Sequence, residues 1–267
     1  YENLKETIEK SEFKPSILVS CIASRSGGIK DSWKVEYDLN MELLKVANQF
    51  QFKKFLLLSA ICVQKPFLEF QRAKLAFENK LQQSSLPHDI IRPTAFFKSL
   101  SGQIERIKKG KSFFLFGDGK ITSCKPISER DLSHFIKMLI EKKKSKNGVH
   151  IIGGPGPSIT PKQQGEILFK LLKKREKFFR INPKIFIFIS LFLFPFSKVS
   201  SRIEDYRQFL KIAYYYATES MLFWNKKTEK YDSNLTPEFG ADILEDFYKD
   251  RINNKTEYFE LKDQKLF

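Results

Sequence analysis

The stretch Leu57-Leu-Ser-Ala-Ile-Cys-Val-Gln-Lys-Pro-Phe-Leu-Glu-Phe-Gln-Arg-Ala-Lys74 decides the fold of this chain. It reads as the end of a buried strand, a loop and then a helix, because a short continuous apolar run is typical of a parallel strand covered on both faces. Ser59 ends the strand, and Lys74 lies about two to three turns into the helix. The stretch therefore predicts one strand–helix unit of a parallel sheet, with a hydroxyl at the strand end and an amine on the helix.

Further strands and helices alternate along the first half of the chain. Apolar runs predict strands at residues 16–20, 55–60, His88–Pro93 and 149–152, and stripes of apolar residues predict helices at residues 1–10, 37–49 and 68–82. A polar loop is expected at residues 20–34. Strands separated by helices favour a parallel sheet with right-handed crossovers, so the expected fold class is α/β with a Rossmann-like parallel sheet.

The pattern changes after Pro93, where helix, strand and turn signals are mixed. A strand is expected at residues 113–116, and Gly117-Asp-Gly119 after it is typical of a hairpin turn. Ser128-Glu-Arg-Asp131 and Thr160-Pro-Lys-Gln163 have the form of helix starts with a capping residue. We therefore expect two parts: residues 1–100 with most of the sheet, and residues 101–267 as a mixed part interleaved with the same sheet.

A glycine-rich turn of the form G-x-x-G-x-x-G does not occur before residue 16. Dinucleotide-binding folds of this kind open with a strand, such a turn and a helix. We therefore expect an N-terminally truncated piece of a longer protein, without the first strands, the turn and any transit peptide, and we expect this piece alone to bind a dinucleotide weakly and to show little activity. The later Gly153-Gly-Pro-Gly156 lacks phosphate-loop spacing and is interpreted as a plain turn.

Ser59 and Lys74 resemble part of the signature of the short-chain dehydrogenase superfamily. In that superfamily a serine at the strand end and a Tyr-x-x-x-Lys motif on the next helix face the nicotinamide, whereas this chain has Phe70-x-x-x-Lys74 and lacks the tyrosine proton donor. Longer strings resemble a narrower family, the NADPH-dependent divinyl chlorophyllide a 8-vinyl-reductases, which are atypical, NmrA-like members. The strings are Val19-Ser-Cys-Ile-Ala-Ser-Arg-Ser-Gly-Gly-Ile-Lys-Asp-Ser-Trp-Lys34, Leu58-Ser-Ala-Ile-Cys-Val-Gln-Lys-Pro66, Ile91-Arg-Pro-Thr-Ala-Phe-Phe-Lys-Ser-Leu100, Cys124-Lys-Pro-Ile-Ser128 and Tyr215-Tyr-Ala-Thr-Glu-Ser-Met-Leu222.

This resemblance implies an oxidoreductase that reduces the 8-vinyl group of divinyl chlorophyllide a, or of divinyl chlorophyll, to ethyl with NADPH in chlorophyll biosynthesis. It implies a chloroplast or other plastid, or the cytoplasm or thylakoid surface of a cyanobacterium. Residues 1–100 would be the second half of the NADP-binding domain, and residues 101–267 the substrate-binding part.

The same resemblance assigns the candidate site residues. Lys74 and Ser59 are the candidate catalytic residues: the lysine would fix the nicotinamide ribose, and the serine would bond the carboxamide or a water. Cofactor-binding candidates lie at strand ends, where ligands of open α/β sheets bind, and comprise Ser20, Cys21, Ala23, Lys74, Pro93, Thr94 and Ala95. The substrate-binding candidates, which would stack on the macrocycle or pair with its propionate, are Trp33, Phe70, Phe96, Phe97 and Lys98, with Arg25 and Lys30 as further cations.

Two questions stay open at this point. Because Phe70 cannot donate a proton, the donor is a water, Lys74 itself or a group that the sequence does not identify. The lost tyrosine also fits a different class of protein, a non-catalytic NADP-binding redox sensor or photosystem assembly scaffold. An isoflavone-reductase-like enzyme, which relies on a lysine without the tyrosine, is a third alternative.

Composition narrows the possible partners. The chain has 267 residues and a formal net charge of +16, from 47 Lys and Arg against 31 Asp and Glu. These cations are scattered and accompany no nucleic-acid motif, so we expect a Lys-rich solvated surface and no nucleic-acid partner. Three cysteines without C-x-x-C spacing favour a reducing compartment and argue against an iron–sulfur cluster, and three isolated histidines predict no metal site.

One segment is apolar for twelve positions, Ile185-Phe-Ile-Phe-Ile-Ser-Leu-Phe-Leu-Phe-Pro-Phe196, and Lys184 and Lys198 close it on both sides. A transmembrane helix needs about 20 such residues, so we expect no membrane span. Three interpretations remain open: buried core, a wall of an apolar ligand pocket, and a peripheral contact with a thylakoid or envelope membrane.

Overall fold

The computed structural model describes residues 2–12, 14–142 and 147–253. The chain forms two compact units that interleave along the sequence. The first comprises residues 1–92, 137–150 and 192–212, and the second comprises residues 93–136, 151–191 and 213–267. Each unit has its own hydrophobic core.

The main sheet has four strands in the order β1-β2-β3-β5, with bounds Ile17–Ser20, Lys54–Leu58, His88–Pro93 and Gly148–Ile152. β1 pairs in parallel with β2, and β2 pairs in parallel with β3, which places Leu58 opposite Ile91. The predicted α/β fold with a parallel sheet is therefore confirmed. Since the strands are parallel, Ser20, Ser59 and Arg92 all lie at the carboxyl ends of neighbouring strands.

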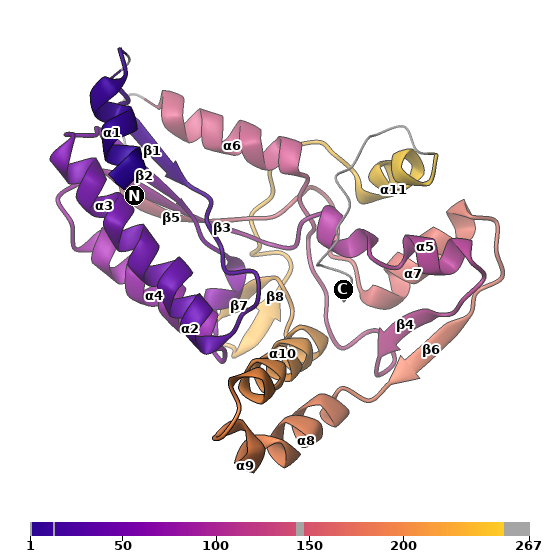
Figure 1. The fold of residues 1–267 in the computed structure, drawn as a ribbon. Coiled ribbons are helices and arrows are strands. Elements are labelled where there is room, and N and C mark those ends of the chain that lie inside the picture. Colours follow the sequence, from indigo (N-terminus) through magenta and orange to yellow (C-terminus); the bar gives the residue numbers. More distant parts are fainter. Residues whose placement is uncertain (1, 13, 143–146, 254–267) are drawn as a thin grey trace. The chain divides into compact units, whose positions relative to one another are not determined.

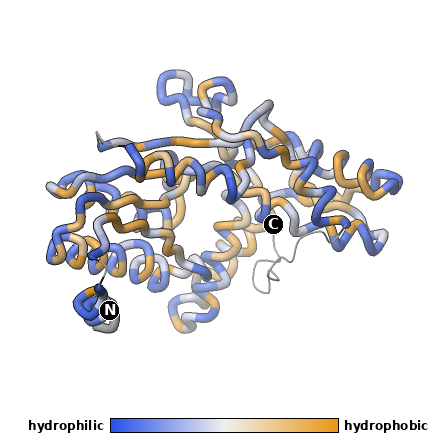
Figure 2. The backbone as a smooth tube through the Cα atoms, turned by 90° about the horizontal axis from the view of Figure 1, so that it is seen from above, coloured by the Kyte–Doolittle hydropathy of each residue, from blue (hydrophilic) through white to orange (hydrophobic). Residues whose placement is uncertain are grey.

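Helices α1 (Glu2–Lys10), α2 (Ile29–Ser32), α3 (Leu39–Gln49) and α4 (Glu69–Gln82) lie beside these strands (Figure 1). Hydrophobic and hydrophilic residues alternate along the helical turns (Figure 2), as expected where one face of a helix packs on a core. The core of this unit consists of Leu44, Ala47, Phe52, Phe55, Leu57, Phe77, Leu81, Leu86 and Ile90.

The polar loop expected at residues 20–34 is shorter than predicted, because α2 begins at Ile29. A π-helical turn, Trp33–Asp38, joins α2 directly to α3. The reason is burial: Ser32 and Glu36 are buried, and this helical run packs against α4. The expected helix start at residue 37 is therefore wrong by two turns. A short 3-10 turn, Ile61–Gln64, links β2 to α4.

The second unit contains two small sheets. β4 (Phe113–Phe116) pairs in parallel with β6 (Phe178–Ile181), and β7 (Phe223–Asn225) pairs in antiparallel fashion with β8 (Lys230–Asp232). The hairpin predicted at Gly117-Asp-Gly119 is wrong, because the partner of β4 is the distant β6. The glycines form only a local turn, in which the Gly119 N–H donates to the Phe116 carbonyl at 3.0 Å.

The core of the second unit lies among α5 (Ile104–Lys108), α7 (Pro161–Leu171) and α11 (Leu244–Ile252). It consists of Phe97, Ile104, Ile107, Phe113, Leu115, Leu168, Phe169, Leu244 and Tyr248. The start of α7 is confirmed as a capping box, since the Thr160 hydroxyl accepts the Gln163 N–H at 3.3 Å and Gln163 Oε1 accepts the Thr160 N–H at 2.8 Å.

Helix α6 (Glu129–Glu141) also begins as predicted, because the Ser128 hydroxyl accepts the Asp131 N–H at 2.9 Å. The carboxylate of Asp131 does not close a capping box. It accepts the backbone N–H groups of Ala241 and Asp242 instead, at 3.1 and 2.9 Å. Asp131 therefore holds the chain that leads into α11.

The apolar segment forms α8 (Lys184–Phe192) and α9 (Phe194–Ser197), followed by α10 (Ser201–Thr218). Burial in the core, one of its three interpretations, is wrong for most of α8: Phe188 is 65% exposed, Phe192 is 73% exposed, and among the α8 residues only Ser190 is buried. None of the helices that the structure describes combines the length and apolar character needed to cross a bilayer.

Candidate functional site

Ser59 belongs to a buried polar network at the carboxyl end of β2. Its hydroxyl donates to Glu78 Oε1 at 2.5 Å, and Glu78 projects from α4. The guanidinium of Arg92, at the end of β3, also binds the Glu78 carboxylate, with Nε at 3.2 Å and through Nη2. Because the Ser59 proton is committed to Glu78, the lone pairs of its oxygen remain for an outside N–H donor.

Lys74 is buried and paired. Its Nζ lies 2.6 Å from Glu36 Oε2, and only 10% of the Lys74 side chain and 2% of the Glu36 side chain are exposed. The other carboxylate oxygen of Glu36 accepts the Ser24 N–H at 2.8 Å, which ties the pair to the loop after β1. The amine is therefore held in one position instead of moving freely on a long side chain.

Three side chains of α4 share one face of the helix, because Phe70, Lys74 and Glu78 are spaced by four residues. Phe70 is half-buried. The indole N–H of Trp33 donates to Glu69 Oε2 at 3.1 Å, and the side chain is 37% exposed, so its ring remains open to a ligand.

The end of β1 is connected to the same cluster. The Ser20 hydroxyl donates to Asn40 Oδ1 at 2.6 Å, and the Asn40 amide donates to the Glu36 carbonyl at 3.0 Å. Cys21 and Ala23 follow, and both are exposed. Both side chains are small, and they precede Ser24, whose N–H binds the carboxylate that holds the Lys74 amine.

The loop after β1 is closed around Asp31. The Ser24 and Ser26 hydroxyls donate to Asp31 Oδ2 at 2.6 and 2.8 Å. These two hydrogen bonds, with that from Ser24 the stronger, hold the pKa of the Asp31 carboxyl below its usual value. Of the two loop cations considered for a propionate, Arg25 lies in this loop and Lys30 lies on α2.

The remaining candidates lie in the second unit. Pro93 and Thr94 are buried, and the Thr94 N–H donates to the Ile152 carbonyl at 2.9 Å while its hydroxyl donates to the Lys125 carbonyl. Ala95 is half-buried, and its carbonyl accepts the Ile127 N–H at 2.9 Å. These hydrogen bonds fix the conformation of the backbone after β3.

Phe96 is half-buried, and Lys98 begins a 3-10 turn, Lys98–Ser101. Phe97 is 2% exposed and packs on Phe247, with the two ring centroids 5.6 Å apart. The ring of Phe97 is thus occupied by the core of its own unit.

Lys125 and Glu238 form an ion pair next to this backbone, and Glu238 Oε2 also accepts the Gly156 N–H at 3.2 Å. The hydrogen bond from Lys125 lowers the pKa of the Glu238 carboxyl. A side chain on Gly154 would place its Cβ 2.0 Å from the Pro126 carbonyl oxygen, so the backbone approaches closely there. The Gly153–Gly156 turn is therefore packed against residues 125–126.

Sequence reasoning did not identify Glu36, Asn40, Glu78 and Arg92 as part of this network. Glu78 could have been identified from the sequence, since it lies four residues after Lys74 on the predicted helix and therefore on the same face. Glu36 gave no such signal, because it lies 38 residues from Lys74, between the loop expected at residues 20–34 and the helix expected from residue 37.

Metal and thiol chemistry find little support in the part of the chain that the structure describes. It contains no cluster of three or more His, Cys, Asp and Glu side chains that could hold a metal ion. None of the three cysteines forms a disulfide, and burial raises the pKa of the Cys124 thiol to about 12, so this thiol stays protonated near neutral pH.

Comparison with known proteins identifies close relatives, although no family model matches the chain. It is 47% identical to the chloroplastic divinyl chlorophyllide a 8-vinyl-reductase of Arabidopsis thaliana, over 98% of this chain and 64% of that protein. The cucumber protein of the same name is 45% identical over 99% of this chain and 64% of its own length. The chain thus spans a little under two thirds of these relatives.

Solved structures with the same fold include a variant of UDP-glucuronic acid 4-epimerase from Bacillus cereus in complex with NAD. It has a TM-score of 0.65 and 15% identity, and the match covers 95% of this chain and 79% of that one. The Bordetella bronchiseptica enzyme WbmG, in complex with NAD and UDP, has a TM-score of 0.62 and 14% identity over 100% of this chain and 78% of its own. At these identities the likeness shows the fold.

Proposed function

The chain is a homologue of the divinyl chlorophyllide a 8-vinyl-reductases along nearly its whole length, and we propose that it takes part in the reaction those relatives are named for. In that reaction the 8-vinyl group of divinyl chlorophyllide a is reduced to ethyl, with NADPH as the cofactor. Since the relatives are named chloroplastic, we place the reaction in a plastid.

One structural observation carries the proposal: the buried Lys74 amine is held by Glu36 on the helix that follows the Ser59 strand end. A long cationic side chain that only served solubility would extend into water. Burying it costs free energy unless its charge is compensated, so a charged amine buried and held fixed on this helix supports a binding or reaction role.

The residues at the carboxyl ends of β1 and β2 fit a dinucleotide. Ser20, Cys21 and Ala23 are small, and the Ser59 oxygen has free lone pairs for an amide N–H. When bound, a reduced nicotinamide supplies the hydride for the reduction. The Lys74 Nζ donates hydrogen bonds to ribose hydroxyls and places positive charge where the reacting alkene becomes electron-rich.

Phe70 and Trp33 serve the apolar macrocycle in this proposal. Phe70 occupies the position that carries tyrosine in related enzymes, so its ring packs against the ligand and gives no proton. The single proton that completes the reduction after hydride transfer then comes from a water or from Lys74 Nζ, which lies on the same helix face as Phe70.

A turnover experiment tests the proposed function. The full-length protein is incubated with divinyl chlorophyllide a and NADPH, and conversion to the 8-ethyl pigment is followed chromatographically. Lys74→Met should reduce kcat by at least about 100-fold, since it removes a group that contacts the cofactor. Lys80→Met, which changes an exposed lysine of the same helix, is the matched control and should retain full turnover.

The fold of each variant is checked by circular dichroism. Wild-type turnover together with an active Lys74→Met enzyme would refute the role given to Lys74. NADPH binding without any pigment reduction would favour the alternative class, a non-catalytic sensor or assembly scaffold.

Peripheral membrane contact is a second proposal, carried by α8. Its residues Ile185, Phe188, Leu191 and Phe192 are between 47% and 73% exposed. The exposed cations Lys198 and Arg202 follow in the chain. An exposed apolar helix with cations close to it in the sequence is typical of segments that lie in the interface of an anionic membrane.

Vesicle sedimentation tests this contact. The wild-type protein should sediment with phosphatidylglycerol vesicles more strongly than with phosphatidylcholine vesicles, and Phe188→Glu combined with Leu191→Glu should abolish sedimentation. The control, Lys226→Glu combined with Lys227→Glu, changes as many exposed positions away from α8. Equal sedimentation of both double variants would show that α8 does not contact the lipid.

A further inference from the structure

The second unit contains a hollow that none of the candidate cofactor- or substrate-binding residues lines. It has a volume of about 500 Å³ and is lined among others by Ile121, Ile181, Pro183, Lys184, Tyr214 and Thr218. This volume lies within the range of small-molecule pockets, roughly 300–1,000 Å³. All of these residues belong to the second unit, so the hollow is formed within one compact part of the chain.

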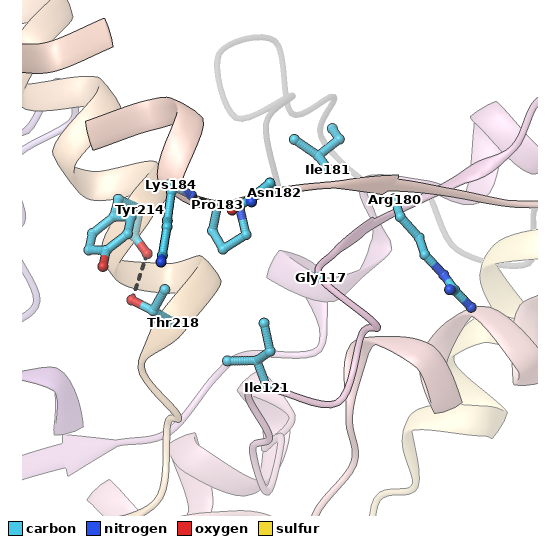
Figure 3. Close-up of a pocket in the computed structure, with 9 residues that line it drawn as sticks. All are labelled: Gly117, Ile121, Arg180, Ile181, Asn182, Pro183, Lys184, Tyr214 and Thr218. Carbon is cyan, nitrogen blue, oxygen red and sulfur yellow. Dashed lines mark hydrogen bonds between the residues drawn. The ribbon is translucent and has the colours of Figure 1, made fainter. Parts of the chain in front are cut away.

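Figure 3 shows how the side chains that line the hollow are arranged. Lys184, Tyr214 and Thr218 lie together on one side, and Ile121 points toward them. Arg180 lines the opposite side, and its guanidinium points away from Lys184. The Thr218 hydroxyl donates to the Tyr214 carbonyl at 2.9 Å, so it remains available only as an acceptor.

Lys184 is the cation that faces the rest of the lining. No described side chain pairs with its amine, although most lysines near carboxylates in this chain form ion pairs. Beside it, Ile121 is 48% exposed. An unpaired ammonium next to an uncovered aliphatic and an aromatic side chain is suited to an anion attached to an apolar body.

We propose that this hollow binds the carboxylate edge of an amphiphilic, planar anion, with the Lys184 amine on the carboxylate and with Ile121, Pro183 and Tyr214 against the apolar part. This inference rests on the proposed function, in which the substrate is a macrocycle with one propionate. We assign to the hollow only the carboxylate-bearing edge of that macrocycle. Lys184, and not Lys98, Arg25 or Lys30, is then the carboxylate ligand.

Equilibrium binding without NADPH tests the inference separately from turnover. Quenching of tryptophan fluorescence is titrated with chlorophyllide a, which has a free carboxylate, and with its methyl ester. The wild-type protein should bind the free acid about three- to tenfold more tightly, the range for a charge-assisted hydrogen bond partly open to water. Lys184→Gln should abolish this preference, and it should leave folding intact because the side chain is exposed.

Lys227→Gln, at an exposed lysine between β7 and β8, is the control and should keep the wild-type preference. An unchanged preference in Lys184→Gln, or no binding of either pigment, would overturn the inference. The proposed function fails by a different result: full-length wild-type protein that distinguishes acid from ester but does not reduce the vinyl group with NADPH. If Lys184→Gln loses the preference and the full-length wild-type protein reduces the vinyl group normally, both the inference and the proposed function are supported.

Discussion

The Lys74 amine and the Glu36 carboxylate form a buried ion pair, with Nζ 2.6 Å from Oε2. Glu36 comes from the π-helical turn between α2 and α3, and Lys74 from α4, so the pair joins two helical segments that pack on each other. Removing one partner of a buried pair leaves an uncompensated charge, which is far more destabilising than removing both partners. This asymmetry distinguishes a structural pair from a surface contact.

Glu36→Gln should lower the free energy of unfolding by about 3 kcal/mol, because the Lys74 ammonium then stays buried without a counter-charge. The double variant Glu36→Gln/Lys74→Met should recover a large part of that loss. Urea unfolding followed by circular dichroism measures both effects. Glu42→Gln, which breaks an exposed pair with Lys45, should leave the midpoint unchanged. A double variant no more stable than Glu36→Gln would show that the pair is not coupled in this way.

The buried carboxylate of Glu78 gives a second prediction, in which two substitutions lower the free energy of unfolding by different amounts. Its side chain is 1% exposed and binds both Arg92 and Ser59. Arg92→Met removes the counter-charge and should cost about 3 kcal/mol, whereas Ser59→Ala removes one hydrogen bond to a carboxylate and should cost about 1–2 kcal/mol. Thermal and urea unfolding measure the order, with Ser99→Ala at an exposed serine as control. The reverse order would mean that Arg92 does not compensate the Glu78 charge.

The sheet was predictable from sequence because its strands are short apolar runs bounded by polar residues. His88–Pro93 matches the expected bounds, and β1, β2 and β5 match within two residues. Such a run of apolar residues can be recognised from a few consecutive positions of the sequence. The pairing of β4 with β6 depends on residues far apart in the chain, so Gly117-Asp-Gly119 gave a hairpin signal with no hairpin.

The candidate site was predictable only in part. Ser59 and Lys74 follow from a strand end and a helix position, which local patterns define. Their partners Glu78 and Glu36 depend on which helices pack together, and Glu36 lies in a helical turn that begins before the helix expected from residue 37. The exposure of α8 was also not deducible, since an apolar run reads the same whether it is buried or faces outward.

Gly154 gives a prediction about the turn after β5. A Cβ there would lie 2.0 Å from the Pro126 carbonyl oxygen, so Gly154→Ala forces the backbone apart and should cost about 3 kcal/mol. Gly110→Ala is the matched control: its φ of +73° is unfavourable for alanine, but no atom lies within 4 Å of the new Cβ, and the cost should be about 1 kcal/mol. Equal losses in urea unfolding would show that residues 125–126 move away freely.

The loop after β1 should make stability depend on pH at acid values. Hydrogen bonds from the Ser24 and then the Ser26 hydroxyl lower the pKa of Asp31 from its ordinary value of 3.8. A carboxyl with a lowered folded-state pKa contributes stability above its ordinary pKa, and this contribution is lost as the pH falls through the folded-state value. Wild-type stability should therefore fall more steeply below about pH 4 than that of Asp31→Asn, as measured by urea unfolding at stepped pH.

Titration of the Asp31 carboxyl by NMR separates this effect from general acid unfolding. Ser24→Ala should raise the pKa of Asp31 toward its ordinary value, because it removes the largest of the interactions that lower it. Ser84→Ala is the control, since that hydroxyl donates to the Leu81 carbonyl and contacts no carboxylate. If Ser24→Ala left the pKa of Asp31 unchanged, the hydrogen bond from Ser24 would not be what lowers it.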